Sequence, residues 1–525
     1  MKFIKSALLT VFSLLLLSCS QDDGKLSFNI IQVNDVYEIA AIQNEQFGGM
    51  ARVETIKQEL LKKNKNTLLM IAGDFLNPSL LGTMKYEGKR ISGRQMIDVM
   101  NAMNFDLAAF GNHEFDVKEH ELQERLNESN FPWISANVFH VMEKDTLAFY
   151  QERNGAKEEV KGSFIKELTD EDGTTIKVGF LSVCIPSNPQ PFVHYTDMYK
   201  AVQEEYNRIK DQVDVVIGLT HVEIEQDEEI AKLLPNIPLI MGGHEHTKKD
   251  RTIGEVSIKK ADANAKSVYI HTINVDQTAK NTTVDSEYKI IDSSIAYESK
   301  VDSLVGEWQC IMKKQISKVV ENPDCVIYNA EVPLDGKDTP TRSVQTNLGE
   351  LVARSFAFSY DDKVDCAFAN GGSIRIDDEL VGDITSVDMF RVLPYGGSAV
   401  KVQMPGNLLE RVLEYGETEG RGSGAYLQRY NTNKVDGVWK VNNRKIATNK
   451  LYTVVLSDYL LLGYDIDFLT EKAILDMGGT VYRPKAGELA SDMRKGLIKY
   501  LKLESKRLKQ TLPDCVSSTG VGDCE

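Results

Sequence analysis

Five short apolar runs in the first half of the chain each end abruptly at polar residues. A continuous apolar run of this length is typical of a strand that is buried on both faces. Helical spacing of apolar residues appears between the runs, and this alternation predicts a layered α/β domain. The runs are FNIIQV, TLLMIA, LAAF, VDVVIGLT and IPLIMGG, and the expected helices are Met50–Lys62, Gly93–Met103, Lys118–Asn127 and Met198–Gln212.

The residues that follow these runs lie where α/β sheets carry their reactive loops, just beyond the carboxyl ends of the strands. The chain has eight histidines, and four of them lie at these strand ends with two aspartates and an asparagine. Such ligands suit Zn, Mn or Fe, and they are too many for one tetrahedral ion. We therefore predict two divalent ions about 3.5–4 Å apart, the arrangement used for in-line displacement at phosphorus. The candidates are Asp35, Asp74, Asn112, His113, His221, His244 and His246.

The motifs NDVY, GD, GNHEFD, TH and GGHEH occur in an order that resembles the calcineurin-like metallophosphoesterase superfamily, and GNHEFD is similar to its 5′-nucleotidase branch. The resemblance implies an α/β first domain, a four-layer β-sandwich flanked by helices, and an α+β second domain. It also implies that a water activated between two divalent ions attacks phosphorus. It assigns one ion to Asp35, Asp74 and His246, and the other to Asp74, Asn112, His221 and His244.

The resemblance leaves His113 without a metal. It places this residue beside the ester, where an imidazolium would stabilise developing charge or protonate the leaving oxygen. Asp116 would orient His113 and keep it charged, and it would also suit the N-cap of a helix over Val117–Leu126. For Glu114 we expect a structural role.

The second half of the chain carries motifs that look like the C-terminal domain of 5′-nucleotidases, among them FANGGSIR and GDITSVDMFRVLPYGG. Asn370–Arg375 is a turn in which glycines such as Gly372 would let a ligand approach backbone amides closely. In the family an arginine at the end of this turn holds the substrate, which makes Arg375 the candidate, since its forked guanidinium suits a phosphate. Arg342 is a second candidate, for which a surface salt bridge is the favoured interpretation.

Members of the family hold the nucleobase between two aromatic rings of this domain. Tyr426 follows a small-residue turn, as one of these rings does, and Tyr459 lies six residues before Asp465, at the place of the other. Stacking on an aromatic ring contributes about 1–3 kcal/mol per base. The alternative is that either tyrosine belongs to the core.

Two places depart from the family pattern. Most members have a histidine ligand where this chain has Tyr37, and a phenol with a pKa near 10 ionises only beside a strongly polarising ion. Either Tyr37 binds a hard ion such as ferric iron, or it stands aside and that ion is bound more weakly, which is our expectation. Tyr464 and Ile466 replace glycines beside the base site, so the base preference, and even a nucleotide substrate, stays open.

The length of 525 residues predicts two or three domains. Helical spacing over Ser293–Val320 predicts a connecting helix. The net charge of −16 argues against a nucleic-acid polymer as a partner, which would need a basic face. The expected boundaries are 26–292 for the metallophosphoesterase domain, 293–326 for the connecting helix, 327–512 for the C-terminal substrate-binding domain and 513–525 for a tail.

Residues 1–19 predict an export signal. Lys2 and Lys5 precede the apolar run Ala7–Leu17, which is too short to span a bilayer. Leu16–Cys19 resembles a lipobox, whose cysteine is lipidated, and residues 20–25 would form a tether; an ordinary secretory signal is the alternative. We therefore expect a lipoprotein of the bacterial cell envelope, periplasmic or on the outer-membrane surface, that meets the membrane only through a lipid anchor at Cys19.

Export would place the remaining cysteines in an oxidising compartment. Cys515 and Cys524 enclose a short tail and are candidates for a disulfide. Cys184 and Cys366 lie in apolar runs, which predicts thiols in the core.

Together these features predict an exported two-metal phosphohydrolase, foremost a 5′-nucleotidase that acts on nucleoside 5′-monophosphates. The alternative substrates are a 2′,3′-cyclic nucleotide, a nucleotide sugar or another phosphomonoester. A different class of function is a surface lipoprotein that keeps the fold for binding and has lost turnover through Tyr37.

Overall fold

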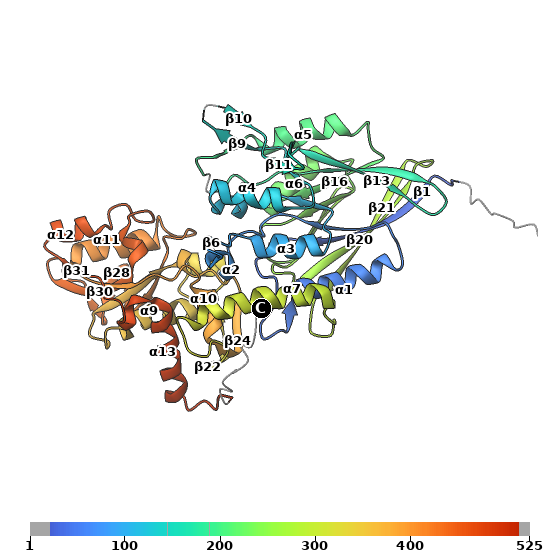
Figure 1. The fold of residues 1–525 in the computed structure, drawn as a ribbon. Coiled ribbons are helices and arrows are strands. Elements are labelled where there is room, and N and C mark those ends of the chain that lie inside the picture. Colours follow the sequence, from blue (N-terminus) through green and yellow to red (C-terminus); the bar gives the residue numbers. More distant parts are fainter. Residues whose placement is uncertain (1–21, 144, 188–189, 514–525) are drawn as a thin grey trace, which may run out of the picture.

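The computed structural model describes residues 22–513 except 144 and 188–189, and it has two lobes joined by a long helix (Figure 1). The predicted export signal, its Cys19 and the tail cysteines Cys515 and Cys524 lie outside the described residues. Within the described part of the chain, no helix combines the length and the apolar character needed to cross a membrane.

The first lobe is built on two six-stranded sheets. The first sheet has the order β21-β20-β1-β4-β7-β8, in which β1 runs parallel to β4 and antiparallel to β20. Its strands are β1 (Lys25–Val33), β4 (Thr67–Ile71), β7 (Leu107–Ala109), β8 (Trp133–Ile134), β20 (Ser267–Asp276) and β21 (Asn281–Ile290). The second, ordered β13-β14-β16-β17-β19-β18, comprises β13 (Ser163–Thr169), β14 (Thr175–Leu181), β16 (Val215–Thr220), β17 (Leu239–Gly242), β18 (Lys249–Ile253) and β19 (Val256–Lys260).

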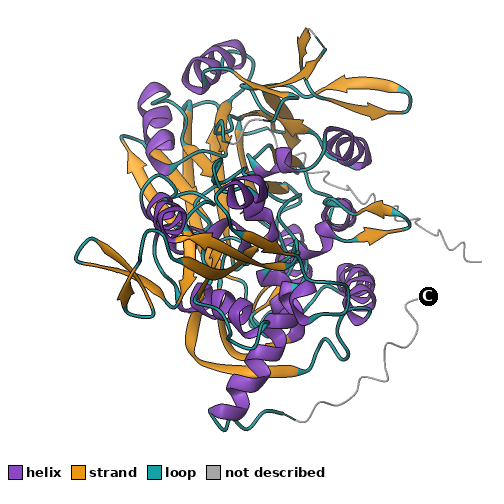
Figure 2. Ribbon diagram, turned by 90° about the vertical axis from the view of Figure 1, so that its left-hand side faces the viewer, coloured by secondary structure: helices purple, strands orange, loops and turns teal. Residues whose placement is uncertain are grey.

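The two sheets pack face to face, and helices cover their outer faces (Figures 1 and 2). Along β1, Phe28 and Ile30 enter the core between the sheets, whereas Ile31 and Val33 join the cluster beneath the helices. Because successive side chains alternate between the faces, a strand covered on both faces reads as an unbroken apolar run. The predicted four-layer architecture is confirmed, with α1 (Met50–Leu61), α3 (Arg94–Ala102) and α4 (Glu119–Glu128) outside one sheet and α5 (Met198–Ile209) and α6 (Ile224–Leu233) outside the other.

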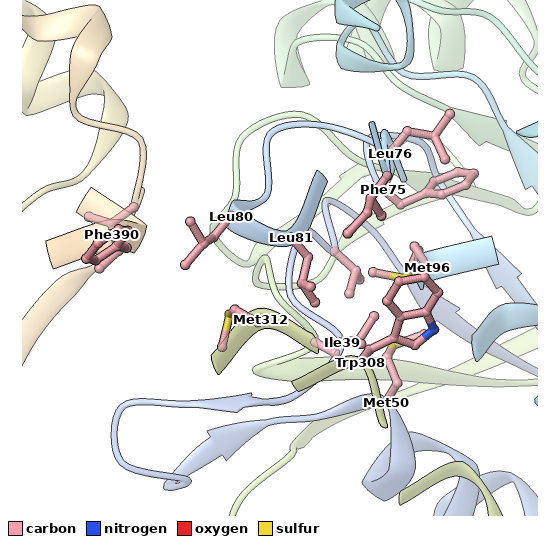
Figure 3. Close-up of a cluster of buried hydrophobic side chains, with 14 of the residues drawn as sticks. Ile39, Met50, Phe75, Leu76, Leu80, Leu81, Met96, Trp308, Met312 and Phe390 are labelled. Carbon is pink, nitrogen blue, oxygen red and sulfur yellow. The ribbon is translucent and has the colours of Figure 1, made fainter. Parts of the chain in front are cut away.

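The connecting helix is α7 (Ser299–Ser317), and both lobes pack against it. It contacts α1 and α3 of the first lobe and α10 (Ser386–Val392) of the second. Trp308 and Met312 belong to one buried cluster with Leu80 and Leu81 of the first lobe and Phe390 of the second (Figure 3). The helix is therefore part of a core that the two lobes share.

The second lobe has the expected α+β fold around a five-stranded sheet ordered β26-β23-β30-β25-β31. One face packs against α9 (Asn347–Phe358) and α13 (Met493–Arg507), and the other against α11 (Gly406–Glu417) and α12 (Glu471–Asp476). Its strands are β23 (Cys366–Asn370), β25 (Ala399–Pro405), β26 (Leu427–Tyr430), β30 (Leu451–Ser457) and β31 (Thr480–Tyr482). A separate pair, β22 (Val326–Asp335) and β24 (Glu379–Thr385), and the short helix α8 (Asp338–Ser343) lie at the boundary with the first lobe.

The cysteines agree in part with the sequence. Cys184 and Cys366 are buried free thiols, as predicted. Cys310 and Cys325, whose pairing the sequence left open, are both disulfide-bonded.

Candidate active site

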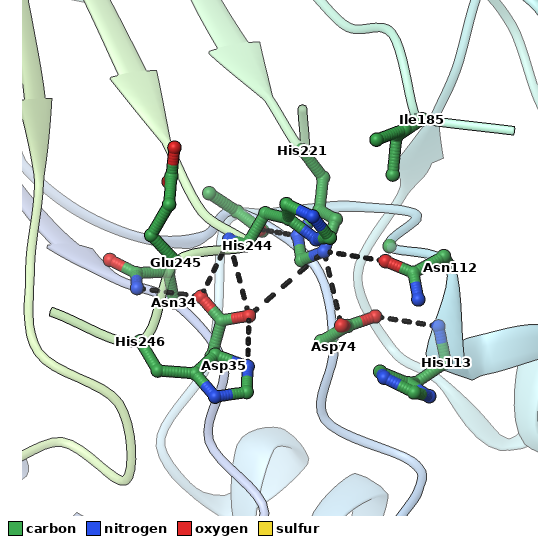
Figure 4. Close-up of polar contacts among 12 residues, drawn as sticks. Asn34, Asp35, Asp74, Asn112, His113, Ile185, His221, His244, Glu245 and His246 are labelled. Atoms are coloured by element: carbon green, nitrogen blue, oxygen red, sulfur yellow. Dashed lines mark hydrogen bonds and ion pairs between the residues drawn. The ribbon is translucent and has the colours of Figure 1, made fainter. Parts of the chain in front are cut away.

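The predicted metal ligands come together at the carboxyl ends of β1, β4, β7, β16 and β17 (Figure 4). Asp35, Asp74 and His221 are fully buried, and their ligand atoms all lie within 4.8 Å of one another. Nδ1 of His221 lies 2.7 Å from the carbonyl oxygen of Ala72, to which it donates, and Nε2 then faces Oδ2 of Asp74 at 3.0 Å. Burial disfavours the imidazolium, yet Asp74 and Asp35 raise the pKa of His221 to about 10. A site that favours positive charge this strongly fits a divalent cation.

The neighbouring ligands extend this cluster on one side. Oδ1 of Asn112 lies 3.2 Å from Nε2 of His221. The backbone N–H of His244 donates to Oδ2 of Asp35 at 2.9 Å, while its ring points towards Glu223, with Nε2 3.2 Å from Oε1. The rings of His221 and His244 lie 5.3 Å apart between centroids. The structure therefore brings together Asp74, Asn112 and His221, three of the ligands that the resemblance assigns to the second ion. The imidazole of His244 lies beside that of His221 but faces Glu223.

On the other side lie His246 and Tyr37. Nε2 of His246 is 3.4 Å from Oδ1 of Asp35, and Nδ1 contacts the carboxylate of Asp377 in the second lobe. The hydroxyl of Tyr37 lies 2.9 Å from Nε2 of His246 and 3.3 Å from Oδ2 of Asp74. Burial, followed by the charges of Asp74 and Asp35, raises the pKa of Tyr37 well above its ordinary value. The hydroxyl of Tyr37 therefore lies among the candidate ligands, and whether it binds the ion or stands aside, as we expected, stays a prediction.

His113 lies next to this cluster without joining it. Its backbone N–H donates to Oδ1 of Asp74 at 2.8 Å, and its Nδ1 lies 2.6 Å from Oδ2 of Asp116. Burial lowers the pKa of His113, but Asp74 and Asp116 outweigh it and raise the value above the ordinary one. Asp116 is not the N-cap of the following helix, which begins at Glu119 with Lys118 as its cap.

Glu114 has the structural role that we expected. Its buried carboxylate accepts four backbone N–H groups, from Asp74, Phe75, Leu76 and Gly111, at 2.6–3.1 Å. Burial and the charge of Asp74 raise its pKa to about 7. Glu114 therefore ties the Asp74 loop to the Asn112 loop and holds two candidate ligands in register.

A buried ionic network supports the loop that carries His244 and His246. Nζ of Lys260 lies 2.9 Å from Asp227 and 2.6 Å from Glu245, and all three side chains have little or no exposure. Glu245 also accepts the backbone N–H of Ile224 at the start of α6. No local pattern in the sequence marks this network, because Asp227 comes from α6, Glu245 from the loop after β17 and Lys260 from the end of β19.

A cleft of about 940 Å³ runs from the ligand cluster into the second lobe. Both lobes line it, so the predicted metal site and most of the predicted substrate-binding residues face one cavity. From the first lobe come Asn112, His113, Asp116 and His244, and from the second come Arg342, Asn370, Gly372, Arg375, Tyr395, Tyr459, Tyr464 and Asp465.

Two guanidinium groups face this cleft. Arg375 is largely buried, its Nη2 lies 3.9 Å from Oδ2 of Asp116, and its Nε has no hydrogen-bond partner among the described residues. Arg342 forms the expected salt bridge, at 2.7 Å to Asp338, but its Nε is likewise unpartnered within the described chain. Buried polar groups normally find partners, so both arginines are suited to an anion in the cleft.

The glycine turn before Arg375 acts differently from the prediction. The N–H groups of Gly371 and Gly372 donate to the carbonyls of Tyr426 and Gly424, at 2.6 and 3.1 Å, so neither is free for a ligand. A Cβ at Gly372 would come within 2.9 Å of Cα of Gly424. The glycines are required because two loops pack closely together here. Asn370 instead uses its side chain, which donates to Asp465 at 3.0 Å.

The assignment of Tyr426 to the base site is corrected by its burial. Its ring is only 1% exposed and does not line the cleft. Tyr459, at 41% exposure, does line the cleft, and its hydroxyl lies 3.4 Å from Asp465. Tyr395, which the sequence analysis missed, lines it as well and is 52% exposed. The signal in the sequence was an aromatic residue between a proline and two glycines in the motif LPYGG.

The two residues of the Leu462–Asp467 turn that replace glycines of the family pattern have different surroundings. Ile466 is fully buried in the core of the second lobe and does not reach the cleft. Tyr464 is 77% exposed and lines the cleft, with its ring 6.2 Å from that of Tyr459. Only Tyr464 can therefore affect the choice of substrate.

Comparison with known proteins agrees with this geometry. A model of calcineurin-like phosphoesterases matches residues 28–248, and a model of the 5′-nucleotidase C-terminal domain matches residues 326–471. This chain belongs to the 5′-nucleotidase family of calcineurin-like phosphoesterases. The 5′-nucleotidase of Homo sapiens is 26% identical to it over 452 residues, which cover 77% of this chain and 74% of the human protein.

Solved structures share the fold of this 5′-nucleotidase family member. The 5′-nucleotidase precursor of Thermus thermophilus has a TM-score of 0.67 and 19% identity, covering 91% of this chain and 97% of its own. The sulfate thiohydrolase SoxB of the same organism has a TM-score of 0.63 and 12% identity, with coverages of 92% and 94%. The family assignment makes the chain a phosphoester hydrolase, and calcineurin-like phosphoesterases generally use two divalent metals, for which the donor set here is suited.

Proposed function

We propose that this protein is a two-metal 5′-nucleotidase that hydrolyses nucleoside 5′-monophosphates to a nucleoside and phosphate. The observation that carries the proposal is the cleft, which is lined both by the candidate metal ligands Asn112 and His244 and by Tyr395 and Tyr459. A nucleotide fits this combination, since its phosphate would face the ions and arginines and its base would contact the aromatic rings.

The candidate ligands form two sets, one for each ion. Asp35, Asp74 and His246 would hold one ion, and Asp74, Asn112, His221 and His244 the other. Two such ions, when bound, lower the pKa of water and polarise the phosphoryl group. Zn, Mn and Fe all suit these oxygen and nitrogen donors.

His113 is placed to act on the leaving group. Because its Nδ1 is engaged by Asp116, Nε2 is the nitrogen left to donate a proton to the leaving oxygen. Asp74 and Asp116 keep the ring charged, which such a general acid requires. Arg375 would neutralise the phosphate, and Arg342 would add a second positive group beside it.

The position of Tyr464 supports a second class of candidate substrates. Where the family has a glycine, this chain has an aromatic ring that lines the cleft next to the ring of Tyr459. A nucleotide sugar or a cyclic nucleotide would present a different shape to these rings, so either remains the alternative to a 5′-monophosphate. A binding lipoprotein with weakened turnover is the third possibility, which would follow from Tyr37 at the first ion.

The substrate is tested by phosphate release after reconstitution with Mn²⁺ or Zn²⁺. Adenosine 5′-monophosphate, a uridine diphosphate sugar and 2′,3′-cyclic AMP should be compared at matched concentrations. We expect the highest kcat/KM for the 5′-monophosphate. A preference for either other substrate would replace the proposal by that activity, and binding of AMP without turnover would favour the third possibility.

We also propose that the protein is exported and anchored through a lipid on Cys19. The motif Leu16–Cys19 supports this, and so do disulfide-bonded Cys310 and Cys325, since disulfides persist in oxidising compartments. In cells that express the full chain, the protein should sediment with membranes. Cys19→Ser should release it to the soluble fraction, and membrane association that survives this change would contradict a lipid anchor.

A further inference from the structure

We propose that Asp377 of the second lobe positions the metal ligand His246 of the first lobe, so that retention of one ion depends on contact between the lobes. The inference rests on the proposed two-metal function and adds to it a residue that contacts neither an ion nor the substrate. Asp377 is therefore a positioning residue.

The carboxylate of Asp377 is held at both oxygens. Oδ2 contacts Nδ1 of His246, and Oδ1 accepts the backbone N–H of Asp338 at 2.6 Å. Its side chain is 15% exposed and that of His246 is 20% exposed, so water competes little for this pair. Asp377 lies between the glycine turn and β24, which places it 131 residues from His246 in the sequence.

This contact decides which nitrogen of His246 is available to an ion. A carboxylate only accepts hydrogen bonds, so Nδ1 carries the proton that faces Asp377. Nε2 is then the nitrogen left with a lone pair, and it lies 3.4 Å from Oδ1 of Asp35, on the side of the ligand cluster. A carboxylate behind a ligating histidine fixes the ring and makes it a stronger donor.

The contact between Asp377 and His246 matters most for the first ion, because that ion has fewer strong donors. Tyr37 occupies the place of a histidine ligand, which leaves Asp35, Asp74 and His246 as its donors. The lobes also meet close by, where Nε2 of Gln43 donates to Asp378 at 2.9 Å. The second lobe thus delivers a carboxylate to the back of a ligand in a region where the two lobes already touch.

Thermodynamic linkage couples ion binding to the contact between the lobes. If the contact of Asp377 with His246 strengthens ion binding, then ion binding must strengthen that contact by the same factor. An ion that binds only the folded protein also raises its melting temperature. Mn²⁺ should therefore raise the melting temperature of the wild-type protein more than that of a variant without the carboxylate.

The test measures Mn²⁺ binding to the full chain by calorimetry, with thermal unfolding as a second readout. In Asp377→Ala we expect one of the two ions to bind about 10–100-fold more weakly, the usual effect of losing an outer partner of a ligand. The Mn²⁺-induced rise in melting temperature should shrink in parallel. Asp377→Asn keeps the size of the side chain but removes its charge, and it should show a smaller loss, which guards against misfolding of the alanine variant.

Gln43→Ala is the matched control, because it removes a nearby contact between the lobes and touches no candidate ligand. It should leave both Mn²⁺ affinities unchanged. Equal weakening in Gln43→Ala and Asp377→Ala would overturn the inference in favour of a general effect of the interface, and unchanged binding in both Asp377 variants would also overturn it. Wild-type protein that binds no Mn²⁺ would instead overturn the proposed two-metal function, and this inference with it.

Discussion

The hydroxyl of Tyr37 lies 2.9 Å from Nε2 of His246, inside the group of candidate ligands. Most family members have an imidazole at the place of Tyr37, and a neutral phenol is a much weaker donor to a divalent ion. Among the other candidate ligands, Asp35, Asp74, Asn112 and His221 converge. A two-metal site at this place would therefore have one weakened position.

Replacing this phenol should strengthen the site. In Tyr37→His we expect the first ion to bind more tightly and activity to depend less on added Mn²⁺, which titration of activity and of binding against Mn²⁺ would measure. Tyr37→Phe is the control, and it should not tighten the ion. A visible charge-transfer band that Tyr37→Phe bleaches, with loss of metal in Tyr37→His, would instead establish Tyr37 as a phenolate ligand of ferric iron.

His113→Ala should leave the metal content intact and lower kcat by about 10²–10⁴-fold, the scale of a positioned acid or base. The reason is that His113 lies beside Asp74 and lines the cleft but is outside the ligand cluster. Elemental analysis and steady-state kinetics on the same preparation make the measurement. Loss of metal in the variant would show that His113 is a ligand.

Tyr459→Ala and Tyr395→Ala should each raise KM for AMP by about 10-fold, since stacking on a base contributes about 1–3 kcal/mol and about 1.4 kcal/mol corresponds to a factor of ten. Both rings line the cleft. Glycerol phosphate, which has no base, is the control substrate, and its KM should stay constant. A similar rise for both substrates would argue against contact with a base.

Tyr426→Ala should behave in the opposite way. Its ring is buried, so its removal should destabilise the fold by about 3–5 kcal/mol, the scale for truncating a large aromatic side chain. Denaturant unfolding would measure the loss, and KM for AMP should change little at a temperature where the variant is folded. A large rise in KM without loss of stability would restore the original assignment of Tyr426 to the base site.

His271 should make the protein less stable in mild acid. Its ring is buried between Gln32 and Ser286, at 2.9 and 2.8 Å, and burial lowers its pKa to about 3. The unfolded chain has a histidine pKa near 6.5, so below that pH the unfolded state binds a proton that the folded state excludes. Stability is then present above pH 6.5 and is lost as the pH falls towards 3, by about 2 kcal/mol between pH 7 and pH 5.

Denaturant unfolding of the wild type and of His271→Gln at several pH values tests this. The variant should be less stable at pH 7 but should lose less stability on going to pH 5. Parallel pH profiles for the two proteins would show that other groups control the acid sensitivity.

Much of the first lobe could be predicted from the sequence because its signals are local. Apolar runs such as those before Asp35 and Asp74 report strands buried on both faces, and the carboxyl ends of such strands gather at one place in an α/β sheet. The candidate ligands could therefore be predicted from short motifs. The four expected helices of this lobe appear within three residues of their predicted ends.

Other assignments depended on which way a side chain points, and the chain pattern does not specify this. Tyr426 and Tyr395 both follow or precede small residues, yet one ring is buried and the other faces the cleft. The turn glycines next to Arg375 were recognised, but only the packing of Gly372 against Gly424 shows why glycine is needed there.

By itself, then, the sequence determined the family and the layered fold and indicated the candidate metal ligands, because each of these follows from residues that are neighbours along the chain. Only the tertiary structure decided how the two lobes cooperate at the site. The contact of Asp377 with His246 and the cleft that joins His113 to Tyr395 unite residues separated by more than a hundred positions. Such contacts arise from the packing of both lobes against α7, and no local pattern records them.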